Sequence, residues 1–116
     1  MMYTVENVTR GGKLGDKVSR AESSRERRTG LLKRASLQTG EGLWIDPCEG
    51  VHTFFMKFPI DVIYLDRKHR IRKIRHALGP WRISLCLTAR SVLEMPAGTA
   101  RRTGSVAGDR LEFREV

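Results

Sequence analysis

Residues 51–66 read VHTFFMKFPIDVIYLD, a largely apolar stretch that Pro59 interrupts. If residues 51–58 form a strand, alternate side chains point to opposite faces, and both faces are largely hydrophobic. Phe54, Met56 and Phe58 lie on one face, and Val51, Thr53 and Phe55 lie on the other. After the proline, residues 60–65 form an apolar run in which Asp61 is the one charged residue. Apolar residues on both faces are typical of strands covered on both sides. The stretch therefore predicts two buried strands, which form the core.

The rest of the chain has the pattern of short strands and turns that is typical of a β protein. Short runs of β-branched and aromatic residues alternate with turns rich in glycine, proline and aspartate. Further strands are expected at residues 3–9, 17–21, 43–45, 71–75, 83–88, 91–95 and 110–114. The expected fold is a mainly β domain, a compact β-sandwich or barrel-like structure with one short helix.

The one expected helix covers residues 24–36. Ser23 followed by Glu26 has the spacing of a capping box, and Leu31, Leu32 and Ala35 then recur at helical spacing. A glycine inside a helix costs about 1 kcal/mol relative to alanine. We therefore expect Gly30 to allow the helix to pack closely against the sheet.

Length and composition favour one domain that spans residues 1–116. A chain of 116 residues buries enough surface for one hydrophobic core and not for two. No apolar run approaches the roughly 20 residues of a membrane span, and residues 1–10 lack the hydrophobic stretch of a signal peptide. The expected location is the cytoplasm, where Cys48 and Cys86 would stay reduced.

The net charge of +9 is unevenly distributed. Residues 1–40 carry a net charge of +5, residues 41–66 carry −4, and residues 67–116 carry +8. The densest basic run, residues 67–76, has no interleaved aromatic residues, so it is interpreted first as a solvated outer face and second as a phosphate contact. The charge leaves nucleic acid, anionic surfaces and small anionic ligands open as partners.

Polar side chains within the apolar stretch suggest a site. His52, Thr53, Lys57 and Asp61 must be hydrogen-bonded if they are buried. On adjacent strands, Asp61 could orient the His52 imidazole, an arrangement found in acid–base sites. The alternative is that both residues only satisfy the core and the bend at Pro59.

Other groupings of polar residues carry less weight. Glu94 is interpreted as the partner of Arg27 in a structural ion pair. Cys48 and His52 are four residues apart, but no second paired motif accompanies them, so no metal or other cofactor is predicted. Cys48 as a nucleophile would need a lowered thiol pKa.

Several segments together resemble the family catalogued as domain of unknown function 192. The resemblance covers residues from about 20 to 114, and it is carried by residues 27–32, 42–43, 51–61, 92–98 and 108–109. It implies a single β-rich prokaryotic domain without an established activity. Many relatives carry an N-terminal membrane or secretion segment, which this sequence does not show.

The leading functional prediction is a non-enzymatic binding module for a small polar or anionic ligand. Its candidate ligand-binding residues are His52, Lys57, Asp61 and Glu94. Arg27, Gly30, Pro59 and Gly98 are candidate structural residues. Two alternatives remain open, a small hydrolase that uses His52 and Asp61, and a charge-driven nucleic-acid binder. The oligomeric state is not predicted.

Overall fold

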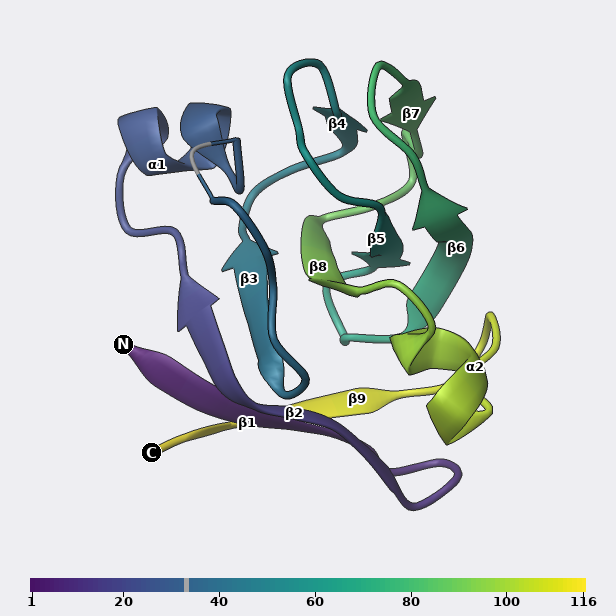
Figure 1. Cartoon of the computed structure of the whole chain (residues 1–116). Coiled ribbons are helices and arrows are strands. Elements are labelled where there is room, and N and C mark those ends of the chain that lie inside the picture. Colours follow the sequence, from purple (N-terminus) through teal and green to yellow (C-terminus); the bar gives the residue numbers. More distant parts are fainter. Residues whose placement is uncertain (33) are drawn as a thin grey trace.

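The structure, a computed structural model, describes residues 1–32 and 34–116. In these residues nine strands and two short helices follow one another along the chain (Figure 1). They are β1 (Met2–Asn7), β2 (Gly12–Arg20), α1 (Ser24–Thr29), β3 (Glu41–Ile45), β4 (Gly50–His52), β5 (Ile60–Leu65), β6 (Ile71–Leu78), β7 (Ile83–Leu85), β8 (Ser91–Pro96), α2 (Thr99–Thr103) and β9 (Leu111–Glu115). The predicted mainly β fold is confirmed. No helix in the described residues is long and apolar enough to cross a membrane.

Seven strands form one curled sheet in the order β6-β5-β8-β3-β2-β1-β9. Its strand pairs are antiparallel except for β2 and β3, which run parallel. The two edges of the sheet meet at one end, where Arg70 bridges Arg110 and the Ile71 amide donates to the Asp109 carbonyl at 2.8 Å. The sheet is therefore a half-barrel that closes locally. The remaining strands, β4 and β7, form a separate two-stranded sheet.

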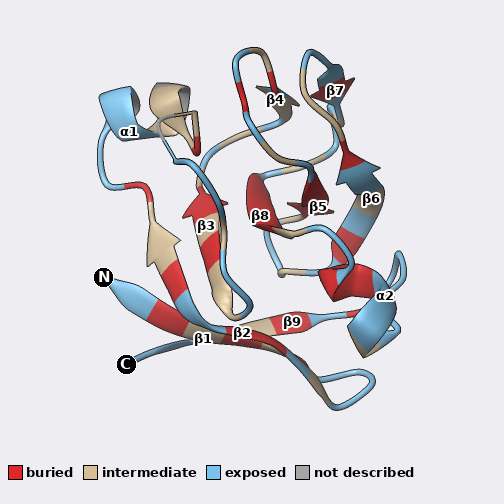
Figure 2. Ribbon diagram, viewed as in Figure 1, coloured by how far each residue is buried: buried red, intermediate tan, exposed pale blue. Residues whose placement is uncertain are grey.

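β5 is buried on both faces, as the sequence predicted (Figure 2). Ile63 and Leu65 belong to the core inside the curl, together with Val5, Trp44 and Leu93. Ile60, Val62 and Tyr64 point the other way, into a second core that lies outside the curl and includes Leu31, Met56 and Val92. The strand thus separates two apolar cores, and neither of its faces reaches solvent. The expectation of a single core is therefore wrong, because both faces of the same strand are covered.

The predicted strand before Pro59 is wrong beyond His52. β4 ends at His52, and the chain then turns, with the Met56 amide donating to the Thr53 carbonyl at 3.1 Å. The Thr53 side chain explains the end of the strand, because its hydroxyl donates to the Gly79 carbonyl at 2.6 Å and accepts from the Arg82 amide at 2.9 Å. These contacts hold the chain after β4 against the segment that leads into β7.

The predicted helix is correct at its start and wrong in its length. The Ser23 hydroxyl accepts from the Glu26 amide at 3.1 Å, which is the predicted cap. The helix ends at Thr29, because Gly30 adopts a φ of +53° and its amide closes the last turn on the Glu26 carbonyl. Gly30 is therefore the C-terminal cap and not an interior position. Lys33, within the predicted helix, lies outside the described residues.

α2 was not predicted, and its stabilising contact comes from a distant strand. Gly98, with a φ of +95°, precedes the helix and offers no side chain to cap it. The Asp61 carboxylate on β5 accepts from the Ala100 amide at 2.9 Å and, with its other oxygen, from the Ala77 amide of β6 at 2.8 Å. Asp61 is fully buried. It therefore caps α2 and ties β5 to β6.

These bonds predict that Asp61→Ala lowers the free energy of unfolding by about 1–3 kcal/mol, because two buried backbone amides lose their acceptor. His52→Ala is the matched control and should cost less than about 1 kcal/mol, since its side chain is exposed on β4. Urea denaturation of both variants measures the difference. Equal losses in the two variants would contradict the assignment of Asp61 as the structural residue of the pair.

Candidate functional site

A cavity of about 330 Å³ lies between α1, β4 and the ends of β3 and β8. These elements lie near one another at one end of the molecule (Figure 1). Leu31 and Met56 from the second core contribute apolar walls. Arg27, Cys48, His52 and Glu94 contribute polar groups. Small-molecule sites have this composition, a mostly apolar surface with a few polar groups that converge.

Glu94 is the buried acid of the cavity. It lies on β8 opposite Leu43 of β3 and Val62 of β5, so two neighbouring strands fix its backbone. Only 4% of the residue is exposed, and its Oε1 atom has no hydrogen-bond partner. Burial raises the pKa of the Glu94 carboxyl from 4.5 to about 7. At neutral pH this group therefore exchanges between a carboxylic acid and a carboxylate.

The turn after α1 lies next to this carboxyl at Gly30. A methyl group built on Gly30 would lie 3.5 Å from Glu94 Oε1, and both residues line the cavity. Oε1 therefore faces the side of the cavity that α1 and its C-terminal turn cover. A side chain on Gly30 would make only an ordinary contact with Glu94, so the requirement for glycine comes from the positive φ of the helix cap and not from close packing within a helix.

Cys48 lies on the wall of the cavity as a thiol. Its Sγ donates to the Gly50 carbonyl at 3.1 Å, and burial raises the pKa of the thiol above its ordinary value. A raised pKa favours the protonated form, which is the opposite of what a nucleophilic cysteine requires. In the described part of the chain, no group of three or more His, Cys, Asp or Glu residues could hold a metal ion.

The structure brings together some of the predicted site residues and separates others. His52 and Glu94 line the cavity, and so do Arg27 and Gly30. Lys57 and Asp61 do not line it. The expectation that His52 and Asp61 lie on adjacent strands is wrong, because β4 pairs with β7 while β5 pairs with β6 and β8. Both oxygens of Asp61 accept backbone amides, and the His52 ring lies 5.1 Å from the Phe54 ring.

The sequence missed the apolar walls of the cavity. Leu31 was expected on a helix and Met56 on a strand, whereas both lie in turns that fold over β8. Glu94 itself carries a local signal, because an acid stands within the apolar run of residues 92–95. The other candidates have structural positions, with Gly98 preceding α2 and Pro59 exposed before β5.

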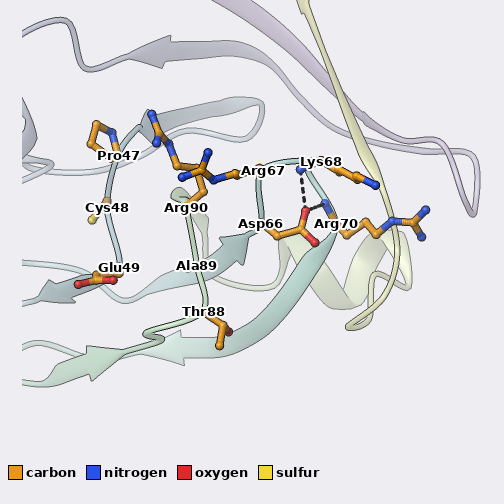
Figure 3. A pocket seen from close by; sticks show the side chains of 10 residues that line it. All are labelled: Pro47, Cys48, Glu49, Asp66, Arg67, Lys68, Arg70, Thr88, Ala89 and Arg90. Atoms are coloured by element: carbon orange, nitrogen blue, oxygen red, sulfur yellow. Dashed lines mark hydrogen bonds between the residues drawn. The ribbon is translucent and has the colours of Figure 1, made fainter.

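A second hollow, of about 850 Å³, is wider and more exposed to solvent. Figure 3 shows its charged side chains around the turn between β5 and β6. Asp66 accepts from the amides of Lys68 and Arg70, and Arg90 donates to Asp46 at 2.9 Å. In Figure 3 the side chains of Lys68 and Arg70 point away from Pro47 and Cys48 on the opposite wall. The charges do not converge on one point, so the Glu94 cavity is the better candidate site.

Comparisons with known proteins identify a family and a fold. The sequence profile of DUF192, described as "Uncharacterized ACR, COG1430", matches residues 6–113. A crystal structure of a protein of unknown function from Novosphingobium aromaticivorans DSM 12444 is similar with a TM-score of 0.80 and 24% identity, over 95% of this chain and 82% of that chain. A protein of Sinorhizobium meliloti 1021 described as "a putative transcription regulator" is similar with a TM-score of 0.82 and 26% identity, over 96% of this chain and 91% of that chain. No curated protein matches the sequence.

The raised pKa of Glu94 predicts a pH-dependent stability. Between pH 4.5 and 7 the folded protein holds a proton that the unfolded chain releases, so the free energy of unfolding falls as the pH rises through this range. The effect of Glu94 is about 2–3 kcal/mol between pH 5 and pH 8. Urea denaturation at the two pH values measures it.

The control for this measurement is Glu94→Gln, which cannot titrate. His69 titrates in the same range with the opposite sign, since burial lowers its pKa, and it is present in both proteins. The difference between the native protein and the variant therefore isolates Glu94. Parallel stability curves for the two proteins would show that Glu94 has an ordinary pKa.

Proposed function

The chain belongs to the uncharacterised family DUF192, and from this premise we propose that it is a binding module for a small ligand that donates a hydrogen bond to Glu94. The observation that carries the proposal is the buried Oε1 atom of Glu94, which faces the cavity without a partner. The ligand class is a molecule with an apolar body and a hydroxyl or amino group.

The energetics of the buried carboxyl favour a donor ligand. A buried acceptor without a hydrogen bond costs about 1–3 kcal/mol, because water no longer solvates it. A ligand that donates to Oε1 recovers this free energy, whereas a ligand without a donor does not. The site therefore distinguishes ligands that have a hydrogen-bond donor from ligands that lack one.

The walls of the cavity favour an apolar body. Leu31, Ile45 and Met56 line it and are all nearly fully buried. An apolar group of the ligand would release water from these walls and gain the corresponding hydrophobic free energy. This combination argues against a strongly anionic ligand at the end of the cavity where Glu94 lies.

A second candidate function is proton transfer by Glu94. A pKa of about 7 is suited to a general acid or base at neutral pH, because both protonation states are populated. The hydrolase pair of His52 and Asp61 has less support, since Asp61 uses both of its oxygens on backbone amides. If the cavity is an active site, Glu94 is the residue that would act as the general acid or base.

A DNA reader that inserts a helix into the major groove has little support in the described residues. The similar protein from Sinorhizobium meliloti is described as "a putative transcription regulator". DNA-binding proteins of the helix-turn-helix class place a helix in the major groove. α1 and α2 contain six and five residues, so each is shorter than two helical turns.

The ligand class can be tested by NMR with three probes of similar size. We expect benzyl alcohol and benzylamine to shift the backbone amides of Gly30, Val51 and His52 in the ¹⁵N-labelled protein. At pH 8, where Glu94 is ionised, benzyl methyl ether, which has no donor, should bind about fivefold or more weakly, because a hydrogen bond to a buried acceptor corresponds to about 1–3 kcal/mol. Equal binding of alcohol and ether would contradict the proposal.

Variants and pH sharpen this test. Glu94→Met keeps the volume and removes the acceptor, so it should abolish the preference for the alcohol over the ether. Glu112→Met, at a half-buried position of β9 outside the cavity, is the matched control and should keep the preference. Benzylamine binding should tighten from pH 6 to pH 8 as Glu94 ionises, whereas binding of the alcohol should not.

A further inference from the structure

The outer surface of the β4–β7 sheet carries a row of exposed apolar side chains, which we call the apolar stripe. It consists of Phe55, Trp81, Ile83, Leu85 and Leu87, which are 71%, 56%, 61%, 56% and 75% exposed. Two of them lie on β7 and the others on the segments next to β4 and β7. Large exposed apolar surfaces on small proteins mark interaction sites.

The two members of the stripe that lie on β7 are held on one side of the sheet. On β7, Ile83 and Leu85 point outward while Ser84 between them points inward and accepts from the Tyr64 hydroxyl at 2.8 Å. The Phe55 and Trp81 rings lie 4.7 Å apart at the end of the sheet. The pairing of Tyr64 with Ser84 prevents β7 from turning its apolar face inward.

The backbone at the aromatic end is strained. Phe55 and Trp81 have φ values of +68° and +63°, which side chains of this size rarely adopt. Thr53 holds both turns, because its carbonyl accepts from the Trp81 amide at 3.0 Å and from the Met56 amide at 3.1 Å. The fold therefore positions two aromatic rings in water at a cost in free energy.

Basic side chains surround the stripe. Residues 67–93 contain eight Lys and Arg and no Asp or Glu. Arg82 is exposed between Trp81 and Ile83, Lys57 is exposed two residues after Phe55, and Lys73 donates to the Leu85 carbonyl at 2.8 Å. Glu49, before β4, is an acidic exception. A partner that complements this surface has an apolar interior, which the stripe can enter, and an anionic surface, which the basic side chains can contact.

We propose that the apolar stripe docks the protein on the surface of an anionic lipid bilayer. Ile83, Leu85 and Leu87 enter the acyl region, Trp81 lies at the level of the headgroups, and Arg82 and Lys57 contact lipid phosphates. The three aliphatic residues favour a bilayer over single-stranded nucleic acid, because they cannot stack on bases. A second copy of the chain is disfavoured, since it would bring two basic hairpins together.

Vesicle co-sedimentation tests the proposal with the full chain. We expect the protein to bind vesicles of phosphatidylcholine with 30% phosphatidylserine at least tenfold more tightly than vesicles of phosphatidylcholine alone, in 0.1 M NaCl. Phe55→Asn combined with Leu87→Ser should weaken this binding at least tenfold. Asn tolerates a positive φ, so the double variant keeps the turn. Val106→Ser is the control, because Val106 is exposed outside the stripe.

Tryptophan fluorescence provides a second readout. Trp44 is buried and Trp81 is exposed, so insertion should shift the emission of Trp81 to shorter wavelength. Trp81→Phe should abolish the shift. Circular dichroism of each variant, compared with the native protein, separates a docking defect from unfolding.

Three results would overturn the proposal. The first is a failure of the lipid test itself. Either the native protein does not bind phosphatidylserine vesicles, or the folded double variant binds them as tightly as the native protein. The second is tighter binding to single-stranded oligothymidine than to vesicles, lost in the double variant, which would assign the stripe to nucleic acid. The third is a dimer of the native protein by light scattering that the double variant lacks, which would assign the stripe to a second copy.

Discussion

The burial of β5 on both faces is the constraint on which the rest of the structure depends. One face completes the core inside the curled sheet, and the other supports a second core beneath β4, β7 and the turns around them. A strand in this position has no solvent-facing side for a polar residue. Its one acid, Asp61, is accommodated because two backbone amides from α2 and β6 solvate both of its oxygens.

Two buried acids on neighbouring strands differ in their hydrogen bonding. Asp61 lies opposite Met95 of β8, one position from the pair of Val62 and Glu94, and it is fully hydrogen-bonded. Glu94 points into the other core, where one of its oxygens has no partner. The carboxyl with satisfied oxygens stabilises the scaffold, and the carboxyl with an unsatisfied oxygen marks the cavity. A site of this kind is maintained against a cost in stability, as functional sites commonly are.

The β4–β7 sheet connects the two proposed surfaces. His52 lines the Glu94 cavity and pairs with Ile83, which is a member of the apolar stripe. The inner side of this small sheet is fixed by the hydrogen bond between Ser84 and Tyr64, and its outer side is left to solvent. Because directly paired residues of an antiparallel sheet share a face, the His52 side chain lies on the same side of the sheet as Ile83, so the cavity and the stripe meet at His52.

The sequence alone determined the mainly β fold, the two-sided burial of β5, the start of α1 and the family resemblance, because these depend on patterns within a few residues of one another. Only the tertiary structure decided the rest. α1 ends early because Gly30 adopts a positive φ and caps the helix, β4 ends early because Thr53 bonds to residues 79 and 82, and α2 forms with a cap supplied from β5. The sequence groups His52 with Asp61 on two strands predicted to be adjacent, whereas the sheets place His52 at the cavity of Glu94. The end of α1 follows from the backbone conformation of Gly30, whereas the other differences arise from contacts between residues that are distant in the chain, which local periodicity does not encode.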